Sequence, residues 1–187
     1  MTSRISHLNI TLMKGRVVLG LFIITQVVYL SMIMITLPQL RELSGGVDPF
    51  DMMPGGYDLE YAMTFLTMIG PEGRAFYLTR QIPLDMVYPG LFALTFAFVW
   101  RWLFTKTNYS PSLLRAGTLL PIFAGFADYA ENGLIISMLT KFPDLPQSLV
   151  HAASLMTITK SVMTTLYFFV LFSLIIIIGL GKLRNKN

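Results

Sequence analysis

The fold of this chain is decided by residues 116–139, which read AGTLLPIFAGFADYAENGLIISML. A helix of about 20 residues, rising 1.5 Å per residue, crosses the hydrocarbon core of a bilayer, so this segment is long enough to span it. Asp128 and Glu131 stand about halfway along the segment. An ionised carboxylate at membrane depth costs several kcal/mol unless a partner satisfies it. These two acids are therefore the first candidates for a functional site.

Three further apolar stretches have a similar length: 15–37, 84–104 and 162–180. No proline interrupts 147–181, so the helix around the last stretch is predicted to cover about 148–181. The chain is 54% hydrophobic and 13% charged, whereas soluble domains are about a quarter charged. Membrane strands would be shorter and would alternate in polarity. The sequence predicts an all-α, four-helix transmembrane bundle with up-down topology, forming one integral membrane domain over 1–187.

Basic residues cluster where the predicted bundle would face the cytoplasm. The N-terminal segment, the connection after 84–104 and the C-terminal segment contain no acid and hold nine basic residues: Arg4, Lys14, Arg16, Arg101, Lys106, Arg115, Lys182, Arg184 and Lys186. The opposite side holds four basic residues. The apolar run 15–37 exceeds the core of a typical signal peptide, about 7–15 residues, so we expect an uncleaved anchor. By the positive-inside rule both termini are then expected to be cytoplasmic.

The extracytoplasmic segment 39–82 is predicted to be partly helical. Its first part, 44–56, is rich in glycine and proline and reads as a loop. Asp58 is a good N-cap for a helix whose apolar positions continue to Ile69. Gly70 and Pro71 then end that helix and begin another that runs towards Arg80. We expect a short amphipathic pair over the mouth of the bundle, and a packing element is favoured over a moving lid.

Polar side chains recur on the segments that would surround 116–139. Asp128, Glu131 and Asn132 follow i, i+3, i+4 spacing and so share one helical face. Two carboxylates one turn apart do not readily both ionise in a low dielectric. Lys160 is the single charge within the last span, in a stripe at helical spacing with Thr157, Ser161, Thr164 and Tyr167.

The other two spans add polar groups at a similar depth. Asp85 and Tyr88 lie in the first turns of 84–104, and Pro89 cannot donate a hydrogen bond to the carbonyl of Asp85. That carbonyl is therefore expected to be a free acceptor beside the acid. Gln26 and Tyr29 share one face of the first span. The four spans together predict a polar level in the outer half of the bilayer, with Arg74 and Arg80 above it.

Three interpretations of this constellation stay open. In the first, a pocket binds or modifies a membrane lipid or another apolar small molecule. Asp128 or Glu131 would be the acid or base and Asp85 its partner, with ligand contacts from Asn132, Lys160, Tyr88, Arg74 and Arg80. In the second, the charges form a structural network in a non-catalytic subunit, in an assembly with a membrane-protein partner or in a homodimer. A proton-coupled carrier ranks last, because no inverted repeat is visible.

The sequence also limits the chemistry. The chain has no cysteine, which excludes thiol redox chemistry and thiolate metal sites. His7 and His151 are far apart and neither has the neighbouring ligands of a metal site. We therefore expect no metal and no cofactor. Because topology explains the net charge of +4, we also expect no nucleic acid partner.

Three motifs carry a resemblance to a known kind of protein. They are Gly70-Pro-Glu-Gly-Arg-Ala-Phe-Tyr77, Asp85-Met-Val-Tyr-Pro89 and Asp128-Tyr-Ala-Glu-Asn132. With them the chain resembles a family of small four-helix bacterial integral membrane proteins that have a DYxEN-type motif in the third helix. The resemblance covers most of the chain from the first span onward. It implies the four-helix architecture and a bacterial inner (cytoplasmic) membrane, and it carries no assigned activity.

Overall fold

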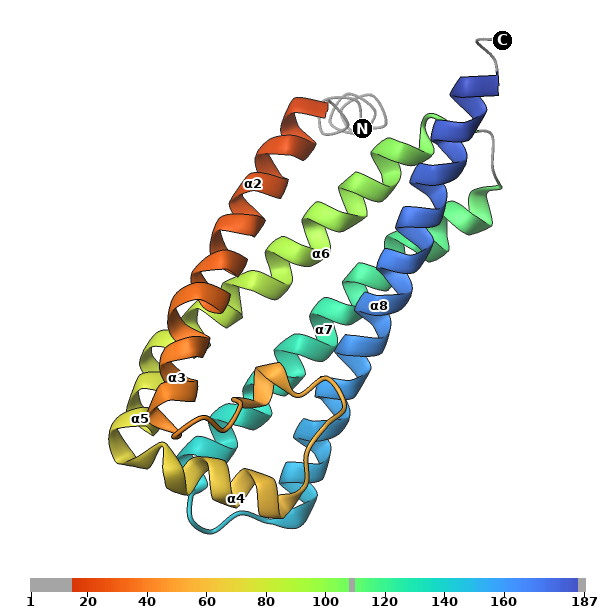
Figure 1. The fold of residues 1–187 in the computed structure, drawn as a ribbon. Coiled ribbons are helices and arrows are strands. Elements are labelled where there is room, and N and C mark those ends of the chain that lie inside the picture. The colour runs from red at the N-terminus through yellow and green to blue at the C-terminus, as the bar shows by residue number, and fades with distance from the viewer. Residues whose placement is uncertain (1–14, 108–109, 185–187) are drawn as a thin grey trace, which may run out of the picture.

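The computed structural model describes residues 15–107 and 110–184 (Figure 1). Within these ranges the chain forms helices and connecting turns, with no strand. Four helical rods are long and apolar enough to span a membrane: Gly15–Leu43, Gly70–Phe104, Ser112–Lys141 and Gln147–Gly181. They confirm the predicted all-α fold with four spans in up-down order. Arg4, Lys14 and Lys186, used above to predict the topology, lie outside the described residues, as do both chain ends.

The first two spans each contain a π-helical turn directly before a proline. In the first span, α2 (Gly15–Ser31) continues through η1 (Met32–Thr36) into α3 (Leu37–Leu43), where Pro38 is the second residue. In the second span, α5 (Gly70–Phe76) continues through η3 (Tyr77–Gln81) into α6 (Ile82–Phe104), where Pro83 is the second residue. Proline lacks the N–H of a regular helix. Each π-helical turn thus lies where a proline interrupts the backbone hydrogen bonds of the helix.

The predicted amphipathic pair is present, but its two helices differ in kind. After the short η2 (Phe50–Met52), α4 (Leu59–Met68) is a separate helix, and the Asp58 carboxylate accepts a hydrogen bond from the Tyr61 N–H at 2.8 Å. The second member, α5, begins at Gly70, whose φ is +64°, and runs without a break into the span. The second span therefore begins at Gly70, well before the predicted residue 84.

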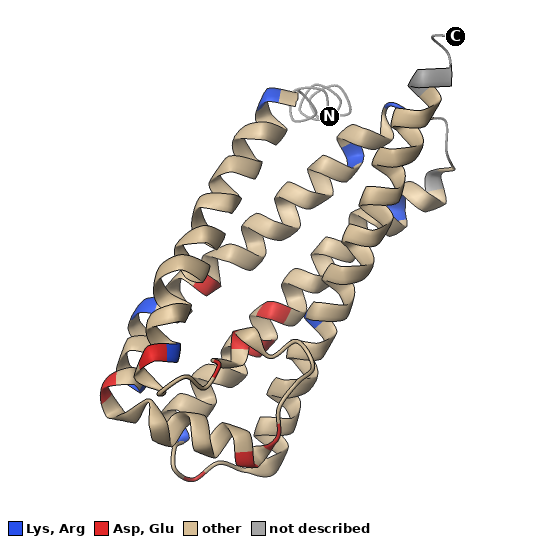
Figure 2. Ribbon diagram, viewed as in Figure 1, with Lys and Arg blue, Asp and Glu red and all other residues tan. Residues whose placement is uncertain are grey.

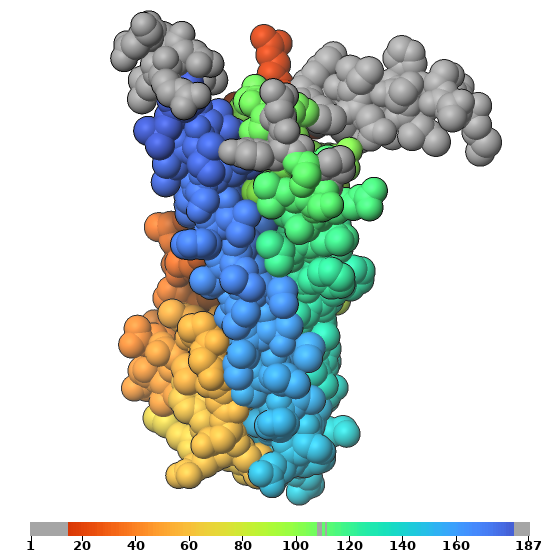
Figure 3. All heavy atoms as spheres, turned by 90° about the vertical axis from the view of Figure 1, so that its right-hand side faces the viewer, coloured from red at the N-terminus to blue at the C-terminus, as the bar shows by residue number. Residues whose placement is uncertain are grey.

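The last two spans form a long antiparallel hairpin. α7 (Pro111–Lys141) and α8 (Gln147–Arg184) pack along most of their length. The connection between η2 and α4 lies against α8, where the Tyr57 N–H donates to the Ser154 hydroxyl at 2.8 Å. The space-filling view shows this segment beside the half of α8 that is remote from the chain ends (Figure 3). The loop before α4 is therefore part of the packed structure.

The spans are arranged as an open row. α2 packs on α6, α6 on α7 and α7 on α8, whereas within the described residues no extensive contact joins α2 to α8 (Figure 1). The side between α2 and α8 is thus not closed by another helix. At this side, aromatic rings of α6 and α8 form the inner wall, and the Tyr167 hydroxyl donates to the Phe96 carbonyl at 2.7 Å.

Charge is divided between the two ends of the bundle. Figure 2 shows basic residues and no acid at the end where the described chain begins, and these are Arg16, Arg101, Lys106 and Arg115. The acidic residues that the structure describes lie from the middle of the bundle to the opposite end (Figure 2). The basic segments that are separate in the sequence therefore lie together at one end of the folded bundle.

Candidate functional site

The centre of the site is an ion-pair network between α7 and α8. The Lys160 ammonium lies 2.9 Å from Asp128 Oδ1 and 2.5 Å from Glu131 Oε2. The Thr157 hydroxyl donates to Glu131 Oε1 at 2.7 Å. Glu131 is fully buried and Asp128 is 7% exposed. One lysine thus serves two carboxylates, a pairing that the i, i+3 spacing on α7 and the polar stripe on α8 had left open.

The link between α6 and α7 uses the carbonyl that Pro89 leaves free. Asn132 Nδ2 donates to the backbone carbonyl of Asp85 at 2.9 Å, so the acceptor expected from the sequence is satisfied by a side chain of the next helix. The helices approach closely nearby, because a Cβ on Gly125 would lie 2.9 Å from the Pro89 carbonyl oxygen. These two contacts fix the turn of α6 that carries Asp85 against α7.

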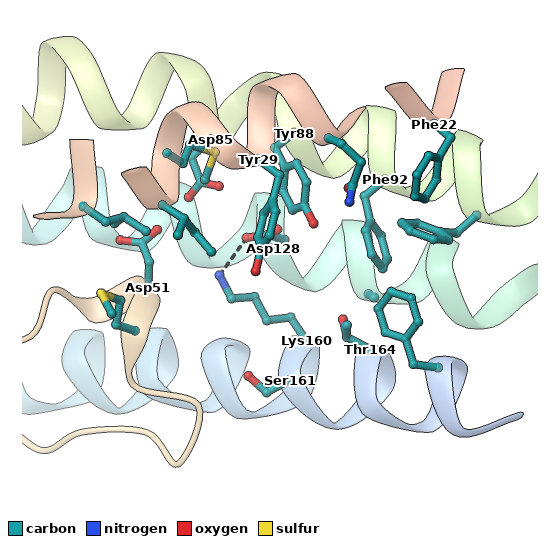
Figure 4. Close-up of a pocket in the computed structure, with 18 of the residues that line it drawn as sticks. Phe22, Tyr29, Asp51, Asp85, Tyr88, Phe92, Asp128, Lys160, Ser161 and Thr164 are labelled. Carbon is teal, nitrogen blue, oxygen red and sulfur yellow. Dashed lines mark hydrogen bonds and ion pairs between the residues drawn. The ribbon is translucent and has the colours of Figure 1, made fainter. Parts of the chain in front are cut away.

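A cavity of about 770 Å³ lies in the open side of the row, between α2 and α8 (Figure 4). Small-molecule sites usually have about 300–1,000 Å³. One end of the cavity gathers the charged, amide and hydroxyl groups of the lining, beside the apolar side chains of Met32, Leu37, Pro38 and Met52; the polar groups are Gln26, Tyr29, Arg41, Asp51, Asp85, Tyr88, Asp128, Lys160, Ser161 and Thr164. In Figure 4, Asp85 and Asp51 lie at one end of the close-up, and Lys160 reaches from α8 to Asp128.

The remainder of the cavity is apolar. It extends along α6 and α8 away from the acids and is lined there by Phe22, Phe92, Phe96, Val99, Phe168, Leu171, Phe172 and Ile175. Rings from α6 and α8 meet edge to face in this wall, as between Phe96 and Phe168, whose centroids are 5.1 Å apart. The cavity is therefore amphipathic along its length, with a polar end and a long apolar end.

Asp51 is a functional candidate that sequence reasoning missed. It enters the polar end from η2, and its carboxylate accepts hydrogen bonds from the Tyr77 hydroxyl and, at 3.5 Å, from Gln81 Nε2. Thr36 in turn donates to Gln81 Oε1, so both π-helical turns contribute to holding this acid. The available signal was the apolar setting of Asp51 in Pro-Phe-Asp-Met-Met, which is unusual for a solvated loop.

Tyr57 lies behind the network on the loop side. The residue is 8% exposed, and its hydroxyl has no hydrogen-bond partner among the described residues. Burial, followed by the nearby Glu131 carboxylate, raises the pKa of the Tyr57 hydroxyl well above its ordinary value. Tyr57 therefore places a buried phenol beside the Glu131 carboxylate from the loop side.

The structure brings together some of the predicted site residues and not others. Asp85, Tyr88, Asp128 and Lys160 line the cavity. Glu131 and Asn132 are buried in the helix interface behind it and do not line it.

The two predicted arginine contacts lie elsewhere. Arg74 donates to the Leu66 carbonyl at 2.6 Å and stacks on the ring of Phe142, with its guanidinium carbon 4.5 Å from the centroid. Arg80 is exposed, and neither arginine lines the cavity. The reason is that α5 and η3 continue the α6 rod instead of folding over the mouth, which turns both arginines away from the polar end.

Within the described ranges, no group of three His, Cys, Asp or Glu side chains is placed to hold a metal ion. The carboxylates of the site instead have a lysine, a threonine, a tyrosine and a glutamine as partners.

No family model, curated protein or solved structure matches this chain.

Proposed function

We propose that this integral membrane protein binds a single amphipathic molecule, a membrane lipid or a similar apolar small molecule, in the cavity between α2 and α8. The observation that carries the proposal is the amphipathic lining, with charged groups at one end and aromatic and aliphatic groups along the rest. The head group of the ligand would lie beside Asp128 and Lys160. Its tail would follow the wall formed by Phe92, Phe96 and Phe168.

The open side of the row supports entry from the bilayer. Several cavity-lining side chains at the two edges of the opening are partly exposed: Phe22 and Ile33 at 37% and 42% on one edge, Phe172 and Ile175 at 58% and 43% on the other. Apolar residues at such a rim match the acyl region of a membrane. A ligand with a hydrocarbon tail could pass between α2 and α8 without leaving the apolar phase.

The proposal concerns binding, and the three acids considered for acid–base chemistry differ in what they can reach. Asp85 and Asp128 line the cavity and can contact a bound molecule. Glu131 is fully buried and is engaged by Thr157 and Lys160, so its part is to hold Lys160.

We also propose that the end carrying Arg16, Arg101, Lys106 and Arg115 faces the cytoplasm, with both termini, in a bacterial inner membrane. The support is the positive-inside rule applied to the described residues, among which that end has no acid. The polar end of the cavity would then lie in the outer half of the bilayer. A reporter fused after Asn187 is expected to be active only in the cytoplasm, and activity on the outer side would contradict this orientation.

A second candidate is a structural role in a membrane assembly or a homodimer. The observation in its favour is that Lys160 pairs with both Asp128 and Glu131, which satisfies these acids without any ligand. Single polar contacts between membrane helices average only about 0.6 kcal/mol, so such a network would set the arrangement of the helices more than it would stabilise them. This candidate leaves the cavity without a role, which is why it ranks second.

Native mass spectrometry of the protein extracted with its own lipids tests the first candidate. We expect a single adduct of defined mass, in a one-to-one ratio, that persists through detergent exchange. Weakly held lipids on the outer surface should be removed by the same exchange. A protein that keeps its helical fold but carries no adduct, or that arrives bound to another polypeptide, would reject the binding proposal and favour the structural one.

A further inference from the structure

The polar end of the cavity has more acids than bases. Three carboxylates line it, those of Asp51, Asp85 and Asp128, and a fourth, Glu131, lies directly behind. Lys160 is the basic residue within the network, and its ammonium already pairs with Asp128 and Glu131. Arg41, the other basic residue of the lining, is largely exposed, with its Nε 3.0 Å from Asp48 Oδ1. Lys160 is thus shared between two carboxylates, and Arg41 lies at the exposed rim, so the carboxylates of this end outnumber the cations.

The carboxylates of this end also differ in how well they are satisfied. Asp51 accepts hydrogen bonds from Tyr77 and Gln81, and Asp128 is paired with Lys160. Asp85 is only 2% exposed, its carboxyl group lies against that of Asp51, and no N–H or hydroxyl donor among the described residues reaches its Oδ2. A buried polar atom without a partner costs about 1–3 kcal/mol, and more when it is charged. Since Asp85 lines the cavity, a bound molecule is positioned to supply the missing donor.

We propose that the head group of the ligand is a protonated amine, which donates to Asp85 Oδ2 between Asp51 and Asp128. This inference rests on the proposed function, because it assigns the head group of the same amphiphile. An ammonium group supplies both the hydrogen-bond donors that Asp85 lacks and the positive charge that the polar end lacks. A phosphate or carboxylate head would face three acids across a medium that screens poorly.

The aromatic neighbours fit the same head group. Tyr29 and Tyr88 stack beside the acids with ring centroids 5.5 Å apart, and both line the cavity. Aromatic faces attract cations within about 6 Å of the ring centroid. The polar end therefore offers an ammonium group two kinds of favourable contact, from carboxylates and from aromatic rings.

The test is a head-group series of equal chain length. Hexadecylamine, hexadecanol and hexadecanoic acid are each added to the delipidated full-length protein in detergent, and bound fractions are measured by native mass spectrometry. We expect hexadecylamine to bind at least about tenfold more tightly than either of the other two. Equal or tighter binding of hexadecanoic acid or hexadecanol would overturn the amine assignment while leaving the amphiphile proposal intact. Absence of binding by all three would overturn both.

Matched variants localise the effect. Asp85→Asn keeps the shape of the side chain and removes its charge, so the preference for hexadecylamine over hexadecanol should fall by about tenfold. Glu60→Gln removes the same charge at an exposed position outside the cavity and should leave the preference unchanged. An unchanged preference in Asp85→Asn would overturn the role of Asp85. The wild-type series decides the amine assignment even if Asp85→Asn does not fold.

Discussion

At the scale of single residues, Lys160 holds the polar end of the cavity together. Its ammonium contacts Asp128 and Glu131, which lie one turn apart on α7, and Thr157 completes the shell around Glu131. The sequence predicted these groups at a similar depth, from the i, i+3, i+4 pattern on α7 and the lone lysine of the last span, but it left open whether Lys160 pairs with the acids. Asp51 was not predictable in the same way, because its place depends on how an irregular loop folds back between helices.

Replacing Lys160 by methionine should be strongly destabilising. Methionine keeps much of the side-chain length but leaves two buried carboxyl groups without their cation, and such losses cost about 3–5 kcal/mol. Reversible unfolding in mixed detergent micelles measures the change in free energy. Lys141→Met, at an exposed position at the end of α7, is the control and should change stability by less than about 0.5 kcal/mol. Equal stability of the two variants would contradict the network.

At the scale of elements, prolines and glycines determine how the spans meet. Pro89 frees the carbonyl that Asn132 binds, and Gly125 lets α7 approach the same turn of α6. The free carbonyl was predicted from Pro89 in the sequence, and the close approach follows from the absence of a side chain at Gly125. The continuous rod from Gly70 to Phe104 was not, because Gly70, Pro71 and Pro83 favour breaks locally. The π-helical turn at η3 and burial of Tyr77 and Gln81 override that local preference.

Two glycines of α7 should respond in opposite ways to alanine. A Cβ at Gly125 would lie 2.9 Å from the Pro89 carbonyl oxygen and 3.2 Å from Ala93 Cβ, so Gly125→Ala should cost about 1–3 kcal/mol through overpacking. At Gly133 a Cβ would meet nothing within 4 Å, and Gly133→Ala should gain up to about 1 kcal/mol of helix propensity. Micelle unfolding of both variants measures this, and a stabilising Gly125→Ala would contradict the close helix approach.

At the scale of the whole molecule, the distinctive feature is that the row of spans is left open. Composition predicted the four spans, but a sequence contains no direct signal for which pair of helices stays apart. The cavity results from that arrangement together with the loop that carries Asp51. The cavity is lined from both sides of this gap by polar side chains, which are thereby kept from contact with lipid. They are Gln26 and Tyr29 on the first span and Ser161 and Thr164 on the last.

The most direct test of the account is a pair of adjacent substitutions on α8. Thr164 lines the cavity at the boundary between its polar and apolar parts, whereas Thr165 is exposed and does not line it. Native mass spectrometry of both tryptophan variants, extracted with their own lipids, compares occupancy directly. We predict that Thr164→Trp fills the cavity and loses the bound amphiphile, while Thr165→Trp retains it as the wild type does. Equal retention by the two variants would contradict binding in the cavity.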